Sequence, residues 1–149
     1  MKIVILTIGN PLKTDDNISN LVGLELKKEG FNVYISETQP ENFISVLRKA
    51  DADTIIFIDA MEFGGDPGAV HIYDFEDLLT DSFSTHSVPV NMIKEYFSGK
   101  EIYCIGIQPK SVYDGQHLTH ELQKKFKEIV EKVLEKIKDI VSLEGPSFL

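Results

Sequence analysis

Apolar positions along the chain fall into short continuous runs separated by segments with helical spacing. Three runs, Lys2–Ile8, Thr54–Asp59 and Glu101–Ile107, are apolar almost throughout and predict strands buried on both faces. Phe31–Ser36 predicts one further strand. After the first run, apolar residues between positions 18 and 26 recur at helical spacing. This alternation of strands and helices predicts a doubly wound α/β fold with a mostly parallel sheet.

Three further helices are predicted from the same periodicity. Glu41–Lys49 and Val88–Phe97 predict short helices, and Thr119–Val141 carries apolar residues at steps of three and four between lysines and glutamates. We expect the charged face of this last helix to be solvated. Phe75–Thr85 has no clear pattern.

A glycine-rich turn at Gly64–Gly68 is followed almost at once by Ala69–Tyr73, which alternates like a strand. So short a connection cannot contain a crossover helix. We therefore expect this strand to be antiparallel to its neighbour, at an edge of the sheet, which makes the sheet mixed.

The 149 residues fit one domain, 1–149, with a frayed tail at 142–149. Its net charge of -9 makes nucleic acid and anionic membrane surfaces poor partners. The single cysteine, Cys104, cannot form an internal disulfide, and the apolar start is too short for a signal peptide or a membrane span. We expect a cytoplasmic monomer.

Candidate chemistry gathers where parallel strands end, because ligands of open α/β sheets bind at that edge. Asp15 and Asp16 follow the first strand, Asp59 ends the third, and His86 precedes the helix before the last strand. Each has a simpler explanation: Asp15 or Asp16 could cap the next helix, Asp59 could accept amides of its turn, and His86 could be an ordinary loop residue.

Together, two carboxylates and an imidazole match the protein half of an open site for a divalent metal. A metal so held can polarise a carbonyl and lower the pKa of water, as amide hydrolysis requires. No Walker loop, G-x-G-x-x-G or His-Glu-x-x-His motif occurs in the sequence. Cys104 lies inside an apolar strand, which favours burial over a nucleophilic role.

Other polar residues point less clearly to chemistry. A serine nucleophile near His86 would lack the nucleophile elbow. The remaining histidines are interpreted as structural or surface residues: His71, His117 and His120.

Several blocks in order along nearly the whole chain resemble the hydrogenase maturation proteases. They are Gly9-Asn10-Pro11-Leu12 with Asp15-Asp16, Asp59-Ala60 with Gly64-Gly65 and Pro67-Gly68, Ser84-Thr85-His86, and Gly106-Ile107-Gln108-Pro109. The resemblance implies a three-layer α/β/α sandwich (phosphorylase/hydrolase-like) around a twisted, mostly parallel mixed sheet of about five strands. It also implies an endopeptidase that trims the carboxyl terminus of the nickel-iron hydrogenase large-subunit precursor.

In this resemblance, Asp16 and Asp59 stand at the family's two metal-contacting acids and His86 at its histidine. The nickel, the expected metal, is already inserted in the precursor, so it is a feature of the substrate, and no organic cofactor is expected. Family members usually continue the acid pair with Gly-x-Gly, whereas Asn17-Ile18-Ser19 follows Asp16 here. The resemblance leaves two mechanisms open. In one, nickel polarises the carbonyl while an acid such as Asp16 activates water. In the other, the three residues only recognise the nickel and orient the precursor chain.

Two other functions compete with the protease. One is a noncatalytic α/β module that binds a metal, a small ligand or the precursor without cutting it. The other is a flavodoxin-like redox protein, which the first loop disfavours because it lacks a Ser/Thr-rich phosphate cradle. Aromatic residues in loops, Phe63, Phe75 to Phe83 and Tyr113, could serve either docking or core packing.

Overall fold

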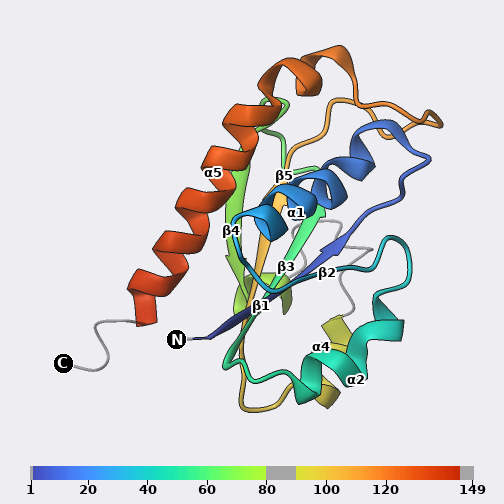
Figure 1. Ribbon diagram of the computed structural model, residues 1–149. Coiled ribbons are helices and arrows are strands. Elements are labelled where there is room, and N and C mark those ends of the chain that lie inside the picture. Colours follow the sequence, from blue (N-terminus) through green and yellow to red (C-terminus); the bar gives the residue numbers. More distant parts are fainter. Residues whose placement is uncertain (1, 80–89, 145–149) are drawn as a thin grey trace.

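A five-stranded mixed sheet forms the middle layer of the computed structural model, which describes residues 2–79 and 90–144 (Figure 1). The strand order is β2-β1-β3-β5-β4, in which β4 alone runs antiparallel to its neighbour β5. This confirms the predicted mixed sheet and its antiparallel edge strand. The strands are β1 (Ile3–Ile8), β2 (Val33–Ile35), β3 (Thr54–Ala60), β4 (Val70–Asp74) and β5 (Glu101–Ile107).

Helices cover both faces of this sheet. The helical segments are η1 (Thr14–Asn17), α1 (Ile18–Lys28), η2 (Pro40–Phe43), α2 (Ile44–Lys49), α3 (Phe75–Leu79), α4 (Val90–Tyr96) and α5 (His120–Glu144). Buried residues of α1 and α5 form one core with the sheet, and those of α2, α3 and α4 form a second. The fold is therefore the predicted three-layer α/β/α sandwich.

The two cores explain why the strand segments are apolar without interruption. Successive side chains of a strand point to opposite faces, so Ile56 and Ile58 of β3 enter the core under α1 and α5. Ile55 and Phe57 of the same strand enter the core under α2 to α4. Both faces of the central strands thus need apolar residues.

Element boundaries differ from the sequence prediction in several places. The predicted helix at Glu41–Lys49 begins as the 3-10 turn η2, and α5 extends to Glu144 where the prediction had a frayed tail. Phe75–Leu79 forms α3, whereas the rest of the unassigned stretch and the start of the helix predicted at Val88 lie outside the described residues.

The path of the chain places a switch point between β1 and β3. From β1 the chain crosses through α1 to β2 on one side, and then crosses the opposite face through α2 to reach β3 on the other side of β1. From β3 the chain goes to β4, at the opposite end of the sheet from β2. Since the chain leaves β1 and β3 in opposite directions, no crossover lies over the carboxyl ends of these two strands. Ligands of open α/β sheets bind at such points.

In the described part of the chain, no helix combines the length and the apolar character needed to cross a membrane.

Candidate functional site

Asp16 lies at the carboxyl end of β1, in the 3-10 turn η1 beside β3. The loop returns so closely on itself that a Cβ on Gly9 would lie 2.2 Å from the Asp16 carbonyl oxygen. Glycine at position 9 is therefore required by this close approach. The Asn10 amide donates to Asp16 Oδ2 at 2.7 Å, which fixes the carboxylate at the switch point.

The Asp16 carboxylate is half-buried, and this burial raises its pKa from the ordinary value. The hydrogen bond from Asn10 and the charge of Lys13 lower the pKa and only partly offset the burial. Within residues 2–79 and 90–144, Asp16 Oδ1 accepts no hydrogen bond. Asp16 thus combines raised proton affinity with an available oxygen.

Asp59 lies at the end of β3, next to Ile8 of β1 in the strand register. It is buried, and it occupies the face of β3 shared by Ile55 and Phe57, under α2 to α4. The structure therefore brings Asp16 and Asp59 to the same edge of adjacent strands, as the strand-end argument predicted.

His86, the third predicted ligand, lies outside the described residues, together with Ser84, Thr85 and Ser87. Among residues 2–79 and 90–144, no three His, Cys, Asp or Glu side chains are grouped closely enough to hold a metal ion. The meeting of an imidazole with the two acids stays a prediction.

Neither Asp15 nor Asp16 caps the helix that follows the first strand, because neither η1 nor α1 has a side-chain cap. The interpretation of these acids as helix caps is therefore wrong. Instead, the fully buried Asp15 carboxylate accepts hydrogen bonds from the segment after β5. Its Oδ2 accepts the amides of Lys110 at 2.9 Å and Ser111 at 3.1 Å, and its Oδ1 accepts the amide of Thr119 at 2.7 Å. The Thr119 hydroxyl also donates to this carboxylate.

Backbone hydrogen bonds extend this junction along both loops. The Thr14 amide donates to the Gly115 carbonyl at 2.9 Å, and the Gly115 amide donates to the Leu12 carbonyl at 2.9 Å. The Thr14 hydroxyl donates to the Ser111 carbonyl at 2.6 Å. Thr14 has a φ of 28°, an unfavourable value for a β-branched residue, and these bonds hold it there.

The loop after β3 is anchored by a different buried side chain, Gln108, at the end of β5. Its Oε1 accepts the amides of Phe63 at 3.0 Å and Gly65 at 3.2 Å. Its Nε2 donates to the Glu62 carboxylate and to the Pro109 carbonyl. One amide side chain therefore uses both its oxygen and its nitrogen to shape the loop that follows Asp59.

Cys104 is fully buried in β5, as predicted. Burial, assisted by the negative charge of Asp59, raises the pKa of its thiol well above the ordinary value. The thiol therefore stays protonated and does not serve as a nucleophile.

The residue after Asp16 does not need glycine in this chain. Asn17 has a φ of -78° and a ψ of -2°, in the right-handed helical region open to any residue. Two further side chains close the turn: Ser19 Oγ donates to the Ile8 carbonyl, and Asn20 Nδ2 donates to the Gly9 carbonyl at 2.8 Å. The departure at Asn17-Ile18-Ser19 is thus compatible with the position of Asp16.

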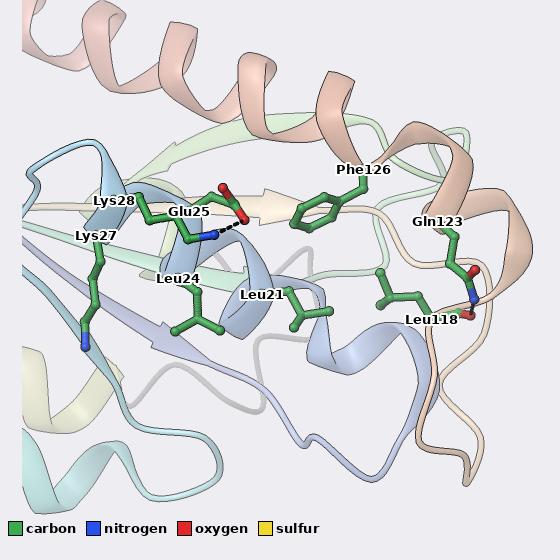
Figure 2. A pocket seen from close by; sticks show the side chains of 8 residues that line it. All are labelled: Leu21, Leu24, Glu25, Lys27, Lys28, Leu118, Gln123 and Phe126. Carbon is green, nitrogen blue, oxygen red and sulfur yellow. Dashed lines mark hydrogen bonds and ion pairs between the residues drawn. The ribbon is translucent and has the colours of Figure 1, made fainter.

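A groove of about 630 Å³ lies elsewhere, on the outer side of the helical layer between α1 and α5 (Figure 2). Its apolar part includes Leu21, Leu24 and Phe126, and an ion pair between Lys28 and Glu25 borders it. It contains no side chain from the ends of the strands, so it is separate from the candidate site.

The sequence did not identify two of the anchoring residues. The sequence indicates Asp15 as a candidate acid or a helix cap and Gln108 as part of a resembling block, and it predicts an anchoring role for neither. A polar residue at the end of an apolar strand, as at Gln108, is the one signal that could have identified it, because a buried amide needs partners.

Comparison with known proteins places these features in one family. The profile of the HycI hydrogenase maturation protease family matches residues 24–136. A relative from Methanocaldococcus jannaschii, described as a hydrogenase maturation protease, is 31% identical, covering 93% of this chain and 90% of its own length. The hydrogenase 3 maturation protease of Escherichia coli is 28% identical over 73% of this chain and 74% of its own length.

The fold is shared with a solved structure of this kind. The [NiFe] hydrogenase maturation protease HybD from Thermococcus kodakarensis superposes with a TM-score of 0.75 at 26% identity, covering 92% of this chain and 99% of that one. The similarity therefore spans nearly the whole three-layer sandwich.

Proposed function

Since this chain belongs to the hydrogenase maturation protease family, we propose that it is the endopeptidase that removes the C-terminal extension from a nickel-iron hydrogenase large-subunit precursor. The observation that carries the proposal to specific residues is the placement of Asp16 and Asp59 at the switch point of the sheet. Asp16 in the turn η1 and Asp59 at the end of β3 lie at the edge where α/β sheets bind their ligands.

We propose that the substrate is the precursor after nickel insertion, and that Asp16, Asp59 and His86 receive its nickel. Carboxylate oxygens and an imidazole nitrogen are suitable donors for a divalent ion of this type. A nickel ion carried in by the precursor would polarise the scissile carbonyl and lower the pKa of nearby water.

Asp16 is the residue that we propose to accept the proton of the attacking water. Burial raises its pKa, and a carboxylate with a raised pKa is a stronger base than an exposed aspartate. The Asn10 amide fixes Oδ2 and leaves Oδ1 as the oxygen for proton transfer. Asp59, buried at the end of β3, contributes negative charge that favours a cation beside it.

The direct test is mass analysis of a nickel-loaded precursor before and after mixing with the protein. The wild type should reduce the precursor's mass by that of its C-terminal extension. Asp16→Asn, Asp59→Asn and His86→Ala should each slow cleavage at least about 100-fold, as loss of a general base does. Asp139→Asn, at an exposed position on α5, is the matched control and should cleave at the wild-type rate.

The precursor's metal content tests whether nickel is part of the recognised substrate. Metal-free precursor should remain uncut, because the nickel is part of the recognised substrate. Full processing by the Asp16 and His86 variants would refute the proposed site, and binding of the nickel-loaded precursor without any loss of mass would favour a noncatalytic module.

A further inference from the structure

Exposed apolar side chains lie on the two loops that surround Asp16. Leu12 is 61% exposed, Val112 46% and Tyr113 82%. Leu12 belongs to the loop that leads from β1 into η1, the turn that bears Asp16. The other two belong to the segment between β5 and α5. Large apolar residues so exposed, and so close together in the fold, are typical of an interaction surface.

The loops that carry these side chains are joined to each other. Backbone hydrogen bonds link Leu12 and Thr14 to Gly115, and the Asp15 amide donates to the Ser111 carbonyl at 3.0 Å. Lys13 Nζ and Asp114 Oδ1 form an ion pair of 3.1 Å across the same junction. The buried Asp15 carboxylate fixes the base of both loops. A surface ordered in this way loses little conformational entropy when a partner binds.

We propose that Leu12, Val112 and Tyr113 form a docking surface for the folded body of the protein substrate, beside the cleavage site. The proposal rests on the proposed function, because that function makes the occupant a large-subunit precursor. A peptide bond that reaches Asp16 belongs to a chain that must pass over the neighbouring loop residues. The body of the precursor therefore covers this junction, and no other occupant is needed to account for its exposed apolar groups.

Tyr113 is the expected centre of the contact. Tyrosine offers a large apolar ring and a hydroxyl at low entropic cost, and tyrosines are enriched among the few residues that dominate interface energies. Its backbone amide is held by a hydrogen bond to Ser111 Oγ at 3.4 Å, while the side chain projects from the loop with most of its surface in solvent. Leu12 on the partner loop widens the apolar contact.

The test compares single variants in cleavage and in binding. Cleavage of nickel-loaded precursor is followed by mass at increasing precursor concentration, and binding is titrated in an Asp16→Asn background, where the precursor is not consumed. Tyr113→Ala should raise both KM and Kd about tenfold, and Leu12→Ala about threefold, with kcat within twofold of wild type.

Leu143→Ala is the matched control. Leu143 is 66% exposed, close to the value of Leu12, but it belongs to the last turn of α5. This end of α5 lies on the side of the sheet where β1 begins, away from its carboxyl end (Figure 1). Its variant should leave KM and Kd unchanged. All three variants should keep the wild-type thermal midpoint, because exposed side chains contribute little to the core.

The outcomes separate the docking surface from the proposed function. Unchanged KM and Kd in both Tyr113→Ala and Leu12→Ala, or an equal loss in Leu143→Ala, would overturn the docking surface and leave the protease intact. If the wild type binds the precursor tightly without cleaving it, and Tyr113→Ala weakens this binding, the result would support the docking surface and overturn the proposed protease activity. Absence of binding by the wild type would overturn both.

Discussion

The loops that follow β1 and β3 lie at the edge of the sheet that carries Asp16 and Asp59, but the two loops are anchored differently. The first loop is fixed by a buried carboxylate, Asp15, which accepts bonds from Lys110, Ser111 and Thr119. The second is fixed by a buried amide, Gln108, which accepts two amides and donates to Glu62. Both anchors connect to the segment that leaves β5.

The difference shows how the polarity of an anchor is matched to its surroundings. Donors alone converge on Asp15, and a carboxylate can accept from all of them. Gln108 meets donors on one side and acceptors on the other, so it needs both an oxygen and a nitrogen. The two anchors should therefore not be interchangeable.

Exchanging the carboxylate for an amide in the first loop should have the largest effect on stability. Asp15→Asn turns one acceptor oxygen into an NH2 group that faces backbone amides. We expect a loss of about 3 kcal/mol in the free energy of unfolding, as leaving buried donors unsatisfied costs. Denaturant unfolding monitored by circular dichroism measures it. A loss below about 0.5 kcal/mol would show that the junction does not depend on the charge.

Exchanging the amide for a carboxylate in the second loop should lower the free energy of unfolding by a smaller amount, and a second substitution should restore part of it. Gln108→Glu keeps the acceptor for Phe63 and Gly65 but places a second carboxylate against Glu62. We expect a loss of about 2 kcal/mol in the free energy of unfolding. Adding Glu62→Gln supplies a donor to the new carboxylate and should recover at least half of the loss. A double-mutant cycle with no coupling between the two positions would contradict this arrangement.

Removing one hydroxyl from the first junction should have a smaller effect. Thr119→Val keeps the shape of the side chain and the backbone amide that donates to Asp15, but it removes the hydroxyl donor. The free energy of unfolding should fall by about 1 kcal/mol. Thr119→Ser restores the donor and is the control. An unchanged free energy of unfolding in Thr119→Val would show that the hydroxyl does not stabilise the junction.

Asp16→Asn should have the smallest effect on stability, and Asp16 should instead determine how cleavage depends on pH. Asp16 has a raised pKa in the folded chain, so its ionised form is favoured less in the folded than in the unfolded state. The free energy of unfolding therefore falls as pH rises from the pKa of the unfolded chain through the raised pKa of the folded chain. Asp16→Asn should change the free energy of unfolding by less than about 0.5 kcal/mol. If ionised Asp16 is the base, activity should fall as pH drops through that raised pKa.

Lys13 tests this assignment because its charge lowers the Asp16 pKa. Lys13→Met should move the acidic limb of the single-turnover pH profile to higher pH. Asp114→Asn removes the ion pair of Lys13 but keeps its charge, and should not move the limb in that direction. Identical profiles for wild type and Lys13→Met would remove Asp16 as the titrating base.

The departure from Gly-x-Gly after the acid pair shows one limit of reading a motif from sequence. Asn17 in that position takes ordinary helical angles, and Gly9 is the residue whose missing side chain the loop needs. The close approach that requires Gly9 is to Asp16, seven positions later, so no local pattern around either residue reveals it.

Sequence by itself determined the layers of this protein, because burial on two faces requires uninterrupted apolar strands and burial on one face requires helical spacing. It also determined which acids follow the first strand and which acid ends the third, since strand ends follow from the same patterns. Only the tertiary structure decided that Asp15 and Gln108 are anchors and that the segment after β5 holds both loops. Hydrogen bonds between loops about a hundred residues apart in the chain depend on which strands are neighbours, and strand order is a property of the whole sheet.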